Sequence, residues 1–496
     1  MIDSLRNGSF DNSDTEFDVS AKTLLDKGSG LRREQVEVVS PATRADLKEV
    51  ITRCGQVGRP FSVISGGRNW GYGGALPVRS NTCVISLRRL DRILDFNSEL
   101  GILHVEAGVT QGRLEQFLAE HGHDYYVPNT GAGPDGSLVG NALERGFGMA
   151  PIEDHAGALL SVSGLLPDGT EFSSSLSGID PLLGACFPAG IGPNLTALAP
   201  QSSWLIVTDV EIQLAKRQRH QELAMVPFQD EDWPRVIAFL QAATSRSDLP
   251  FGGYKILHRA QVSESTKNAN WVQRLTTTRE WTLMFFFRCE PALAGGFRKE
   301  TRKLLKKRGL SVRMWKRSKI ENLIWILGWL KQNFSVAAFE SVRNALCDLN
   351  EFFRLGDGHT SLVGHRVKRD HQGLIWLSPL CPMTAEHVAR LRKITQSWSR
   401  PSPLSATTWT WTVLNSRTLA LVMPLVFPAD TPQTEVWRDY HEKLETLCSA
   451  GFTPYRFPIE CMDFVRDKIA PDYFRLVARV EKALDPDGLF NAGRYS

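Results

Sequence analysis

Five glycines fall within residues 65–74, directly after the apolar run 61–64. The loop reads Ser-Gly-Gly-Arg-Asn-Trp-Gly-Tyr-Gly-Gly. Such a loop bends sharply and lets a ligand approach the backbone closely. Its successive N–H groups can form a concave site for phosphate oxygens. It lacks both the Gly-Lys-Ser/Thr ending of the ATP/GTP loop and the dinucleotide pattern Gly-x-Gly-x-x-Gly. Taken alone, an ordinary glycine-rich turn explains it equally well.

A second glycine-bearing segment spans residues 128–146, and a third glycine turn spans residues 190–194. In the second segment, Ser137 and Asn141 can donate hydrogen bonds to ligand oxygens. Two separate glycine loops within one domain suit a long ligand with a central diphosphate. The glycines of the second segment are Gly131, Gly133, Gly136, Gly140 and Gly146.

The elements that must position these loops alternate between short strands and helices over residues 36–214. Strands are predicted at 36–39, 61–64, 82–87, 101–105 and 205–214. A helix with an apolar stripe is predicted over 47–54, with Ser40 as N-cap and Pro41 in the first turn. A second helix is predicted from Gln111 to His121, ending at Gly122.

Residues 215–450 differ in composition from residues 36–214, because they hold most of the tryptophans and several basic helical segments. Strands are predicted at 281–287, 408–412 and 418–423. We expect a second α+β domain here. In the remaining tail, 451–496, the sequence pattern predicts an amphipathic helix near 474–484 and a turn at 485–488.

Composition limits the class of protein. A 496-residue chain with 42% hydrophobic and 23% charged residues indicates a globular protein of two or three domains. A net charge of +4 without a long basic block gives no sign of nucleic-acid binding. The eight scattered cysteines argue against a zinc site and a disulfide scaffold. The polar N-terminus and the short apolar stretch 323–330 predict no membrane partner and a cytoplasmic location.

Several segments together resemble the vanillyl-alcohol oxidase / p-cresol methylhydroxylase family of FAD enzymes. They are the loop 65–74, the segment 137–146, Asp154-His155 and the tail 483–493. The resemblance implies an α+β fold with a two-subdomain FAD-binding domain and a cap domain containing an antiparallel sheet. The implied divisions are an N-terminal extension (1–34), the FAD-binding domain (35–215), the cap (216–450) and a C-terminal segment (451–496) that returns to the FAD-binding domain.

The same resemblance implies which residues contact FAD. They are Ser65, Gly66, Gly67, Arg68, Asn69, Gly71, Tyr72 and Gly73 in the first loop, Gly136, Ser137, Gly140, Asn141, Arg145 and Gly146 in the second segment, and Val207 and Arg494 elsewhere.

The phenol-oxidising members of the family carry a tyrosine in the first loop and a Tyr-Arg pair near the C-terminus. Tyr72, Tyr455 and Arg456 match these positions. A free phenol has a pKa of about 10, so ionising it below neutral pH costs about 4 kcal/mol. One guanidinium and two hydroxyl donors directed at the phenol oxygen can supply that energy in a dry site. The phenolate then helps expel a hydride from the para carbon.

Two further features follow from the resemblance. Asp154 matches an aspartate beside flavin N5, where a carboxylate can act as a base.

Family members often link FAD covalently to the cap or the first loop, but those positions hold Leu374 and Arg68 here. His371 lies three residues from the cap position. We therefore expect FAD to be bound without a covalent link.

These observations favour an FAD-dependent enzyme that oxidises a para-substituted phenol by hydride transfer, with O2 as acceptor and H2O2 as product. A dehydrogenase that passes electrons to a cytochrome-type protein is a close alternative. A third hypothesis is a flavoenzyme that modifies a larger phenolic secondary metabolite, since the tryptophan-rich cap leaves room for one. A non-enzymatic flavin-binding protein is the least favoured hypothesis. A homodimer is compatible with all of these.

Overall fold

The computed structural model describes residues 23–26, 29–259, 279–334, 372–399, 402–406, 409–428, 430–469 and 471–495, with residues 342, 343, 346, 347, 349, 350, 353, 354 and 356. His371 and most of the predicted N-terminal extension lie outside these residues. Helices, antiparallel sheets and one small parallel sheet build the described chain, in agreement with the predicted α+β class.

A small parallel sheet leads into the first glycine loop. Its strand order is β3 (Glu37–Val39), β5 (Cys83–Ser86) and β4 (Phe61–Ile64). Helix α2 (Arg44–Gln56) packs its predicted apolar stripe into the core of this region.

The predicted N-cap of α2 at Ser40 was wrong. The Thr43 hydroxyl accepts a hydrogen bond from the Asp46 N–H, and the Asp46 carboxylate accepts one from the Thr43 N–H. This capping box satisfies the first N–H groups of the helix three residues later than predicted.

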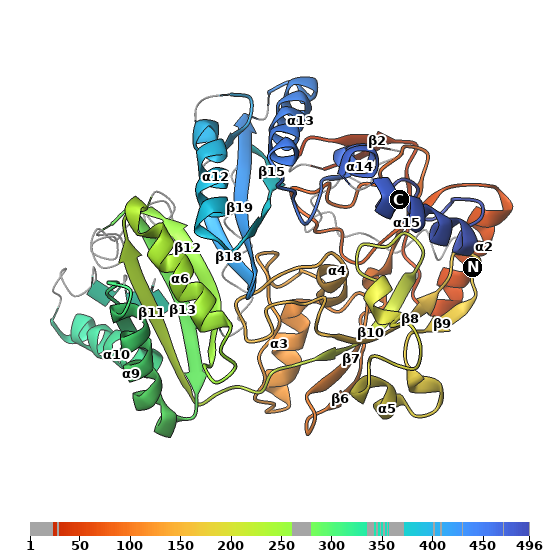
Figure 1. Ribbon diagram of the computed structural model, residues 1–496. Coiled ribbons are helices and arrows are strands. Elements are labelled where there is room, and N and C mark those ends of the chain that lie inside the picture. The colour runs from red at the N-terminus through yellow and green to blue at the C-terminus, as the bar shows by residue number, and fades with distance from the viewer. Residues whose placement is uncertain are drawn as a thin grey trace.

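A five-stranded antiparallel sheet forms the second part of this region (Figure 1). Its strand order is β6 (Ile93–Asn97), β7 (Ile102–Glu106), β10 (Ile206–Gln213), β8 (Leu159–Leu165) and β9 (Glu171–Ser173). The accompanying helices are α3 (Gln111–Glu120), α4 (Leu138–Leu143) and α5 (Pro181–Cys186). Helix α3 ends as predicted, because Gly122 takes a positive φ of 66°.

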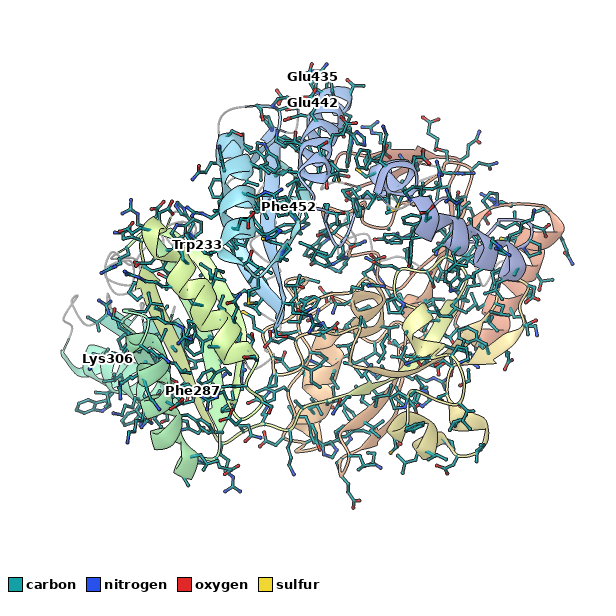
Figure 2. The ribbon with its side chains drawn as sticks, viewed as in Figure 1. Trp233, Phe287, Lys306, Glu435, Glu442 and Phe452 are labelled. Carbon is teal, nitrogen blue, oxygen red and sulfur yellow. The ribbon has the colours of Figure 1, made fainter. Side chains whose placement is uncertain are left out.

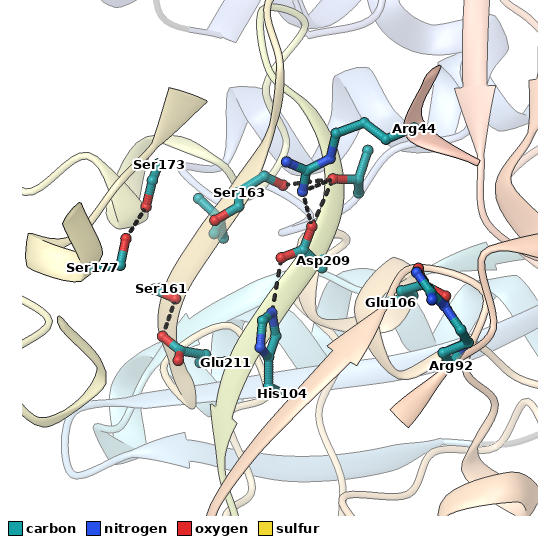
Figure 3. A network of polar contacts seen from close by, with 12 residues as sticks. Arg44, Arg92, His104, Glu106, Ser161, Ser163, Ser173, Ser177, Asp209 and Glu211 are labelled. Atoms are coloured by element: carbon teal, nitrogen blue, oxygen red, sulfur yellow. Dashed lines mark hydrogen bonds and ion pairs between the residues drawn. The ribbon is translucent and has the colours of Figure 1, made fainter. Parts of the chain in front are cut away.

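A buried carboxylate joins the two parts of this region (Figure 3). Asp209 on β10 accepts hydrogen bonds from His104 at 2.9 Å and Thr208 at 2.7 Å, and forms an ion pair with Arg44 of α2. Burial alone would raise the pKa of Asp209, but these donors and the Arg44 charge hold it below its ordinary value. The ionised carboxylate therefore fixes α2 against the sheet.

The cap contains a nine-stranded antiparallel sheet. The main strand order is β14 (Arg313–Lys316), β11 (His220–Phe228), β13 (Trp281–Cys289), β12 (Phe251–His258), β18 (Thr410–Asn415), β19 (Thr418–Pro428) and β15 (Gln372–Leu377). Strands β16 (Leu380–Pro382) and β17 (Ser405–Ala406) also pair with β19. The strands predicted at 281–287 and 418–423 are confirmed.

Helices cover both faces of the cap sheet. One face packs against α6 (Trp233–Thr244), α9 (Ala294–Lys306), α12 (Ala385–Thr395) and α13 (Gln433–Ser449). Figure 2 shows Trp233 between α6 and the sheet, where its ring meets Trp281 edge-on at 5.2 Å between centroids, whereas Lys306 and Glu442 are exposed. The other face packs against α10 (Arg317–Phe334). No helix of the described chain is both long and apolar enough to cross a bilayer.

The C-terminal segment returns to the parallel sheet. After α14 (Met462–Phe464) and α15 (Pro471–Leu484), the Phe61 N–H donates to Leu489 O at 2.8 Å. The Asn491 N–H donates to Phe61 O at 2.7 Å, and the Phe61 and Phe490 rings stack. This tail thus extends the small sheet beside β4. At the other end of the chain, β1 (Thr23–Leu25) pairs with β2 (Arg32–Glu34).

The first glycine loop also holds strand β15 of the cap. Gly71 has a φ of 72°, and a Cβ there would lie 2.4 Å from Trp376 Cδ1 and 3.1 Å from Leu374 Cδ2. The Trp376 N–H donates to Gly71 O at 3.2 Å. Glycine at this position therefore serves both the backbone conformation and the close approach of the cap.

We expect Gly71→Ala to destabilise the protein more than Gly122→Ala. Both glycines have similar positive φ values, but nothing lies within 4 Å of a Cβ at Gly122. The difference therefore isolates the collision with Trp376, which costs about 1–3 kcal/mol as overpacking. Thermal unfolding followed by circular dichroism should show a melting temperature lower by about 1–3 °C for Gly71→Ala than for Gly122→Ala. Equal melting temperatures would mean that the Trp376 side chain moves aside without a loss of stability.

Candidate active site

The two glycine segments lie side by side at the carboxyl end of β4. A Cβ at Gly140 would lie 3.1 Å from Ser65 Oγ, and Arg68 forms an ion pair with Asp135 at 3.2 Å. The Gly66 carbonyl accepts a hydrogen bond from Arg88 at 3.1 Å. The segments are 70 residues apart in sequence, yet they build one surface.

The first loop presents unpaired backbone donors. Among the described contacts, the N–H groups of residues 66, 67 and 69–71 donate to no protein acceptor. Tyr72 and Gly74 instead donate to Asn69 O at 3.0 and 3.1 Å, which closes the turn. Such a row of free N–H groups fits the phosphates of a dinucleotide.

In the second segment, two predicted donors serve the protein itself. Ser137 caps α4, because its Oγ accepts from the Gly140 N–H at 2.9 Å and donates to Ala107 O at 2.8 Å. The Asn141 amide contacts the Nδ1 of His155. These side chains therefore shape the segment. Gly136 closes a turn with Gly133, its N–H donating to Gly133 O at 3.1 Å.

The remaining predicted FAD contacts lie in separate parts of the chain. Arg145 follows α4, is exposed and has a φ of 52°; the next N–H, that of Gly146, donates to Asn141 O at 2.8 Å. Val207 is buried in β10. Gly73 has a φ of 112° beside Ile459.

Tyr72, Tyr455 and Arg456 meet in space. The Arg456 guanidinium carbon lies 4.4 Å from the centre of the Tyr72 ring, and Arg456 Nη2 donates to Asn69 Oδ1 at 2.5 Å. Tyr455 precedes Arg456, and its ring meets Phe147 edge-on at 6.3 Å. Residues nearly 400 positions apart thus form one cluster at the first loop.

Glu144 holds this cluster in place. Its carboxylate lies 3.8 Å from Arg456 Nη2, forms an ion pair with Arg494 and accepts from the Tyr495 hydroxyl at 3.4 Å. Gln201 adds bonds to Tyr455 O and to the Tyr495 hydroxyl at 3.1 and 3.3 Å.

The sequence interpretation missed Glu144, Gln201 and Tyr495. Glu144 falls inside the second glycine segment, so a search for a carboxylate able to pair with Arg456 could have found it. Nothing in the sequence marks Gln201.

Burial sets the protonation of the cluster. Burial raises the pKa of Tyr72, Tyr455 raises it further, and Arg456 opposes the rise, so the Tyr72 hydroxyl keeps its proton. Burial works against the charge of Arg456, but the Tyr72 and Glu144 oxygens hold its pKa above the ordinary value. The site therefore presents a permanent cation next to a neutral hydroxyl, a combination that favours an anion.

Asp154 and His155 lie on a hairpin beside the cluster. Phe147 pairs with Asp154, and the Gly148 N–H donates to Glu153 O at 2.9 Å. The exposed Asp154 carboxylate accepts from the Gly157 N–H at 3.0 Å, a turn-stabilising bond. Burial lowers the pKa of His155 to about 4, and its Nε2 has no hydrogen-bond partner among the described residues. This neutral ring offers a buried polar atom to a bound group.

In the cap, the position at which related enzymes often link FAD covalently lies against the first glycine loop. Leu374 on β15 approaches Gly71, as described above, and its side chain has no nucleophile. Arg68, at the loop position, is engaged with Asp135 and stacks over Trp70 at 5.8 Å.

Comparisons with known proteins agree with this arrangement. Residues 37–175 match the FAD binding domain family. The chain is 25% identical over 494 residues to 1'-carboxy-chondrochloren decarboxylase of Chondromyces crocatus, covering 92% of this chain and 90% of that protein. It is 27% identical over 198 residues to the 4-cresol dehydrogenase [hydroxylating] flavoprotein subunit of Pseudomonas putida, covering 39% and 37% of the two chains. The crystal structure of p-cresol methylhydroxylase with substrate bound superposes with a TM-score of 0.79 at 19% identity, over 92% of this chain and 88% of that one.

The chain therefore contains an FAD binding domain and has the fold of p-cresol methylhydroxylase, as the predicted resemblance implies. It is an FAD-dependent oxidoreductase with the α+β fold predicted for the family. FAD is its cofactor, and the unpaired N–H groups of the first loop fit the diphosphate.

We expect the FAD to dissociate when the protein unfolds, because neither Leu374 nor Arg68 can bond to the flavin. Acid precipitation and centrifugation should leave the yellow colour in the supernatant. Flavin fluorescence on the protein band of a denaturing gel would contradict this expectation. His371→Ala would then test whether that histidine forms the link.

Proposed function

We propose that this flavoenzyme oxidises a phenol whose oxygen binds between Tyr72, Tyr455 and Arg456. The observation that carries the proposal is the Arg456 guanidinium beside the Tyr72 ring, fixed by Asn69 and Glu144. A largely buried cation grouped with two tyrosines is suited to a phenolate.

These residues would act on the substrate in a definite order. Arg456 lowers the cost of ionising the phenol, and the tyrosine hydroxyls orient the oxygen. When bound, FAD supplies a two-electron oxidant that accepts a hydride. Electron density from the phenolate promotes loss of that hydride from the benzylic carbon, which leaves a quinone methide. In this proposal the Asp154 carboxylate acts as the base towards water that adds to the quinone methide.

We expect Arg456→Ala to lower kcat/KM for 4-alkylphenols. The loss should correspond to about 3 kcal/mol of transition-state stabilisation, the cost of one lost buried charged bond. Tyr72→Phe and Tyr455→Phe should cost less, about 1–2 kcal/mol each. Anaerobic flavin bleaching in a stopped-flow instrument provides the measurement. Methyl ethers of the same phenols serve as controls, since they cannot ionise. Equal bleaching by a phenol and its methyl ether would disprove phenolate binding.

Asp154 provides a second test, because Asn keeps the turn and removes the base. Asp154→Asn still accepts from the Gly157 N–H, whereas Asp154→Ala loses both functions. If Asp154 is the base, both variants should slow turnover by roughly 10²–10⁴-fold with normal FAD content. If Asp154 only caps the turn, the Asn variant should match the wild type and the Ala variant should lose stability.

The relative from Chondromyces crocatus supports a second candidate function. Its similarity spans nearly the whole chain, including the cap, and its name describes a decarboxylase. Oxidative decarboxylation of a larger phenolic metabolite uses the same phenol-binding cluster. An oxygen electrode and a peroxide assay separate O2 from a cytochrome-type protein as the final electron acceptor in either case.

A further inference from the structure

One helix of the cap has an exposed apolar face. Helix α10 packs one side against the cap sheet, where Ile320 is buried. Its other side carries Trp325, Trp329 and Ile326, which are 72%, 51% and 42% exposed. A helix that is apolar all round is normally buried on every side, and tryptophan is a highly buried residue on average. An exposed apolar face of this kind marks a contact surface.

The two tryptophans form one stripe along the helix. Trp325 and Trp329 are four residues apart, so they are neighbours on the helix surface. They belong to the stretch 323–330, whose shortness led to the prediction of no membrane partner. That length rules out spanning a bilayer, but a helix can also lie along the surface of one. In that arrangement, tryptophans enter the headgroup region and basic side chains remain outside.

A cavity of about 250 Å³ lies at the start of α10. It forms where the chain crosses from β10 to β11 and meets the end of β14. Its described lining residues contain four basic side chains and one carboxylate, that of Glu321. The basic residues are Arg217, Arg219, Lys316 and Arg317.

The positive charge of this cavity is only partly compensated. The Arg217 and Arg317 guanidinium groups each have an acidic partner, at 3.6 and 2.8 Å. Lys316 and Arg219 form no ion pair with any residue that the structure describes. The cavity therefore has two cations available for an anionic ligand.

Two further features of the cavity favour an anion. The first turn of α10 contains Arg317 and Lys319 and no acidic residue, so no side chain there balances the positive end of the helix dipole. The first N–H groups of a helix also suit phosphate oxygens. Gln221 in the cavity wall is 6% exposed, and neither polar atom of its amide has a hydrogen-bond partner in the described chain. Such a wall suits a polar occupant.

The cavity and the tryptophans lie on the same side of α10. Glu321 lines the cavity and precedes Trp325 by four residues, and Trp325 precedes Trp329 by four. Residues at this spacing lie one above the other on a helix. One continuous surface can therefore contact the cations at the start of the helix and the tryptophans farther along it.

The neighbouring surface is also basic. Helix α9 lies at the same end of the cap (Figure 1) and contains a single acidic residue, Glu300. Its exposed basic residues are Lys299, Arg302, Lys303 and Lys306. This charge attracts an anionic surface. It disfavours a second copy of the chain, which would bring like charges together.

The place of this surface in the fold disfavours an electron-accepting protein as the partner. Helix α10 lies at one end of the molecule, away from α4 and the FAD-binding region (Figure 1). A protein docked on α10 would be remote from the flavin that it must oxidise.

We propose that α10 lies on the surface of a membrane that contains anionic phospholipids, with Trp325 and Trp329 in the headgroup region and a lipid phosphate in the cavity beside Lys316 and Arg219. This inference goes beyond the proposed function, because none of the residues assigned to the phenol takes part. The helix lies along the bilayer and does not cross it.

Co-sedimentation of the FAD-loaded protein with vesicles tests the proposal. The probe is an equimolar mixture of phosphatidylcholine and phosphatidylglycerol, and pure phosphatidylcholine is the control. The protein should bind the mixed vesicles at least about 10-fold more strongly, and added salt should weaken this binding. Trp325→Ala should weaken it about 10-fold, as expected for the loss of one inserted aromatic side chain. Lys316→Met should weaken it about 5-fold, the effect of one cation at an anionic surface.

Two matched variants remove similar groups elsewhere on the molecule. Phe187→Ala removes an aromatic side chain that is 53% exposed after α5, and Lys482→Met removes an exposed lysine of α15. Both should bind the mixed vesicles as the wild type does. Circular dichroism and flavin content should be unchanged in all four variants, since the altered side chains lie outside the first glycine loop.

Several results would overturn the proposal. One is equal binding to the two kinds of vesicle, and another is equal weakening by the control variants. A wild-type dimer that Trp325→Ala converts to a monomer in light scattering would show that the apolar face contacts a second copy. Thermal stabilisation by glycerol 3-phosphate without any vesicle binding would show that the cavity takes a soluble phosphate and that α10 binds no membrane.

Discussion

The Glu144 carboxylate is the interaction on which the rest of the site depends. It stands between two guanidinium groups from the C-terminal segment, those of Arg456 and Arg494, and it also meets the Tyr495 hydroxyl. A buried guanidinium needs a paired anion, and without one its neighbours would have to rearrange. Because Glu144 directly follows α4, the second glycine segment and the cluster of Tyr72, Tyr455 and Arg456 are fixed by the same short stretch of chain.

Two of the contacts that hold the cap require glycine. Gly71 admits Trp376 of β15, and Gly252-Gly253 admits Glu153 of the hairpin. Each contact seats a side chain of one part of the chain against the backbone of the other. The cap sheet is therefore held against the first glycine loop and against the hairpin.

Local patterns in the sequence predicted the elements well. The apolar alternation of β10, the glycine that ends α3 and the run that forms β4 were all visible, because these depend on neighbouring residues. The start of α2 was predicted three residues too early, because Ser40 and Thr43 both have side chains that can cap a helix. The sequence also indicated Tyr72, Tyr455 and Arg456, but only through resemblance to a family. The contacts of Gln201, Tyr495, Lys255 and Arg288 could not be predicted, because strand register and the return of the tail decide which distant residues meet.

The return of the tail has a consequence for the order of folding. The backbone of Phe61 pairs with Leu489 and Asn491, more than 400 residues later in the chain. Contacts of such long sequence separation form late, since a large loop must close first. During synthesis the first glycine loop emerges early, but its sheet is complete only after residues 489–494 have emerged and Arg494 can reach Glu144. Capture of the nucleotide in its final geometry therefore follows the synthesis of these residues, and until then the unfinished sheet edge is exposed to misassembly.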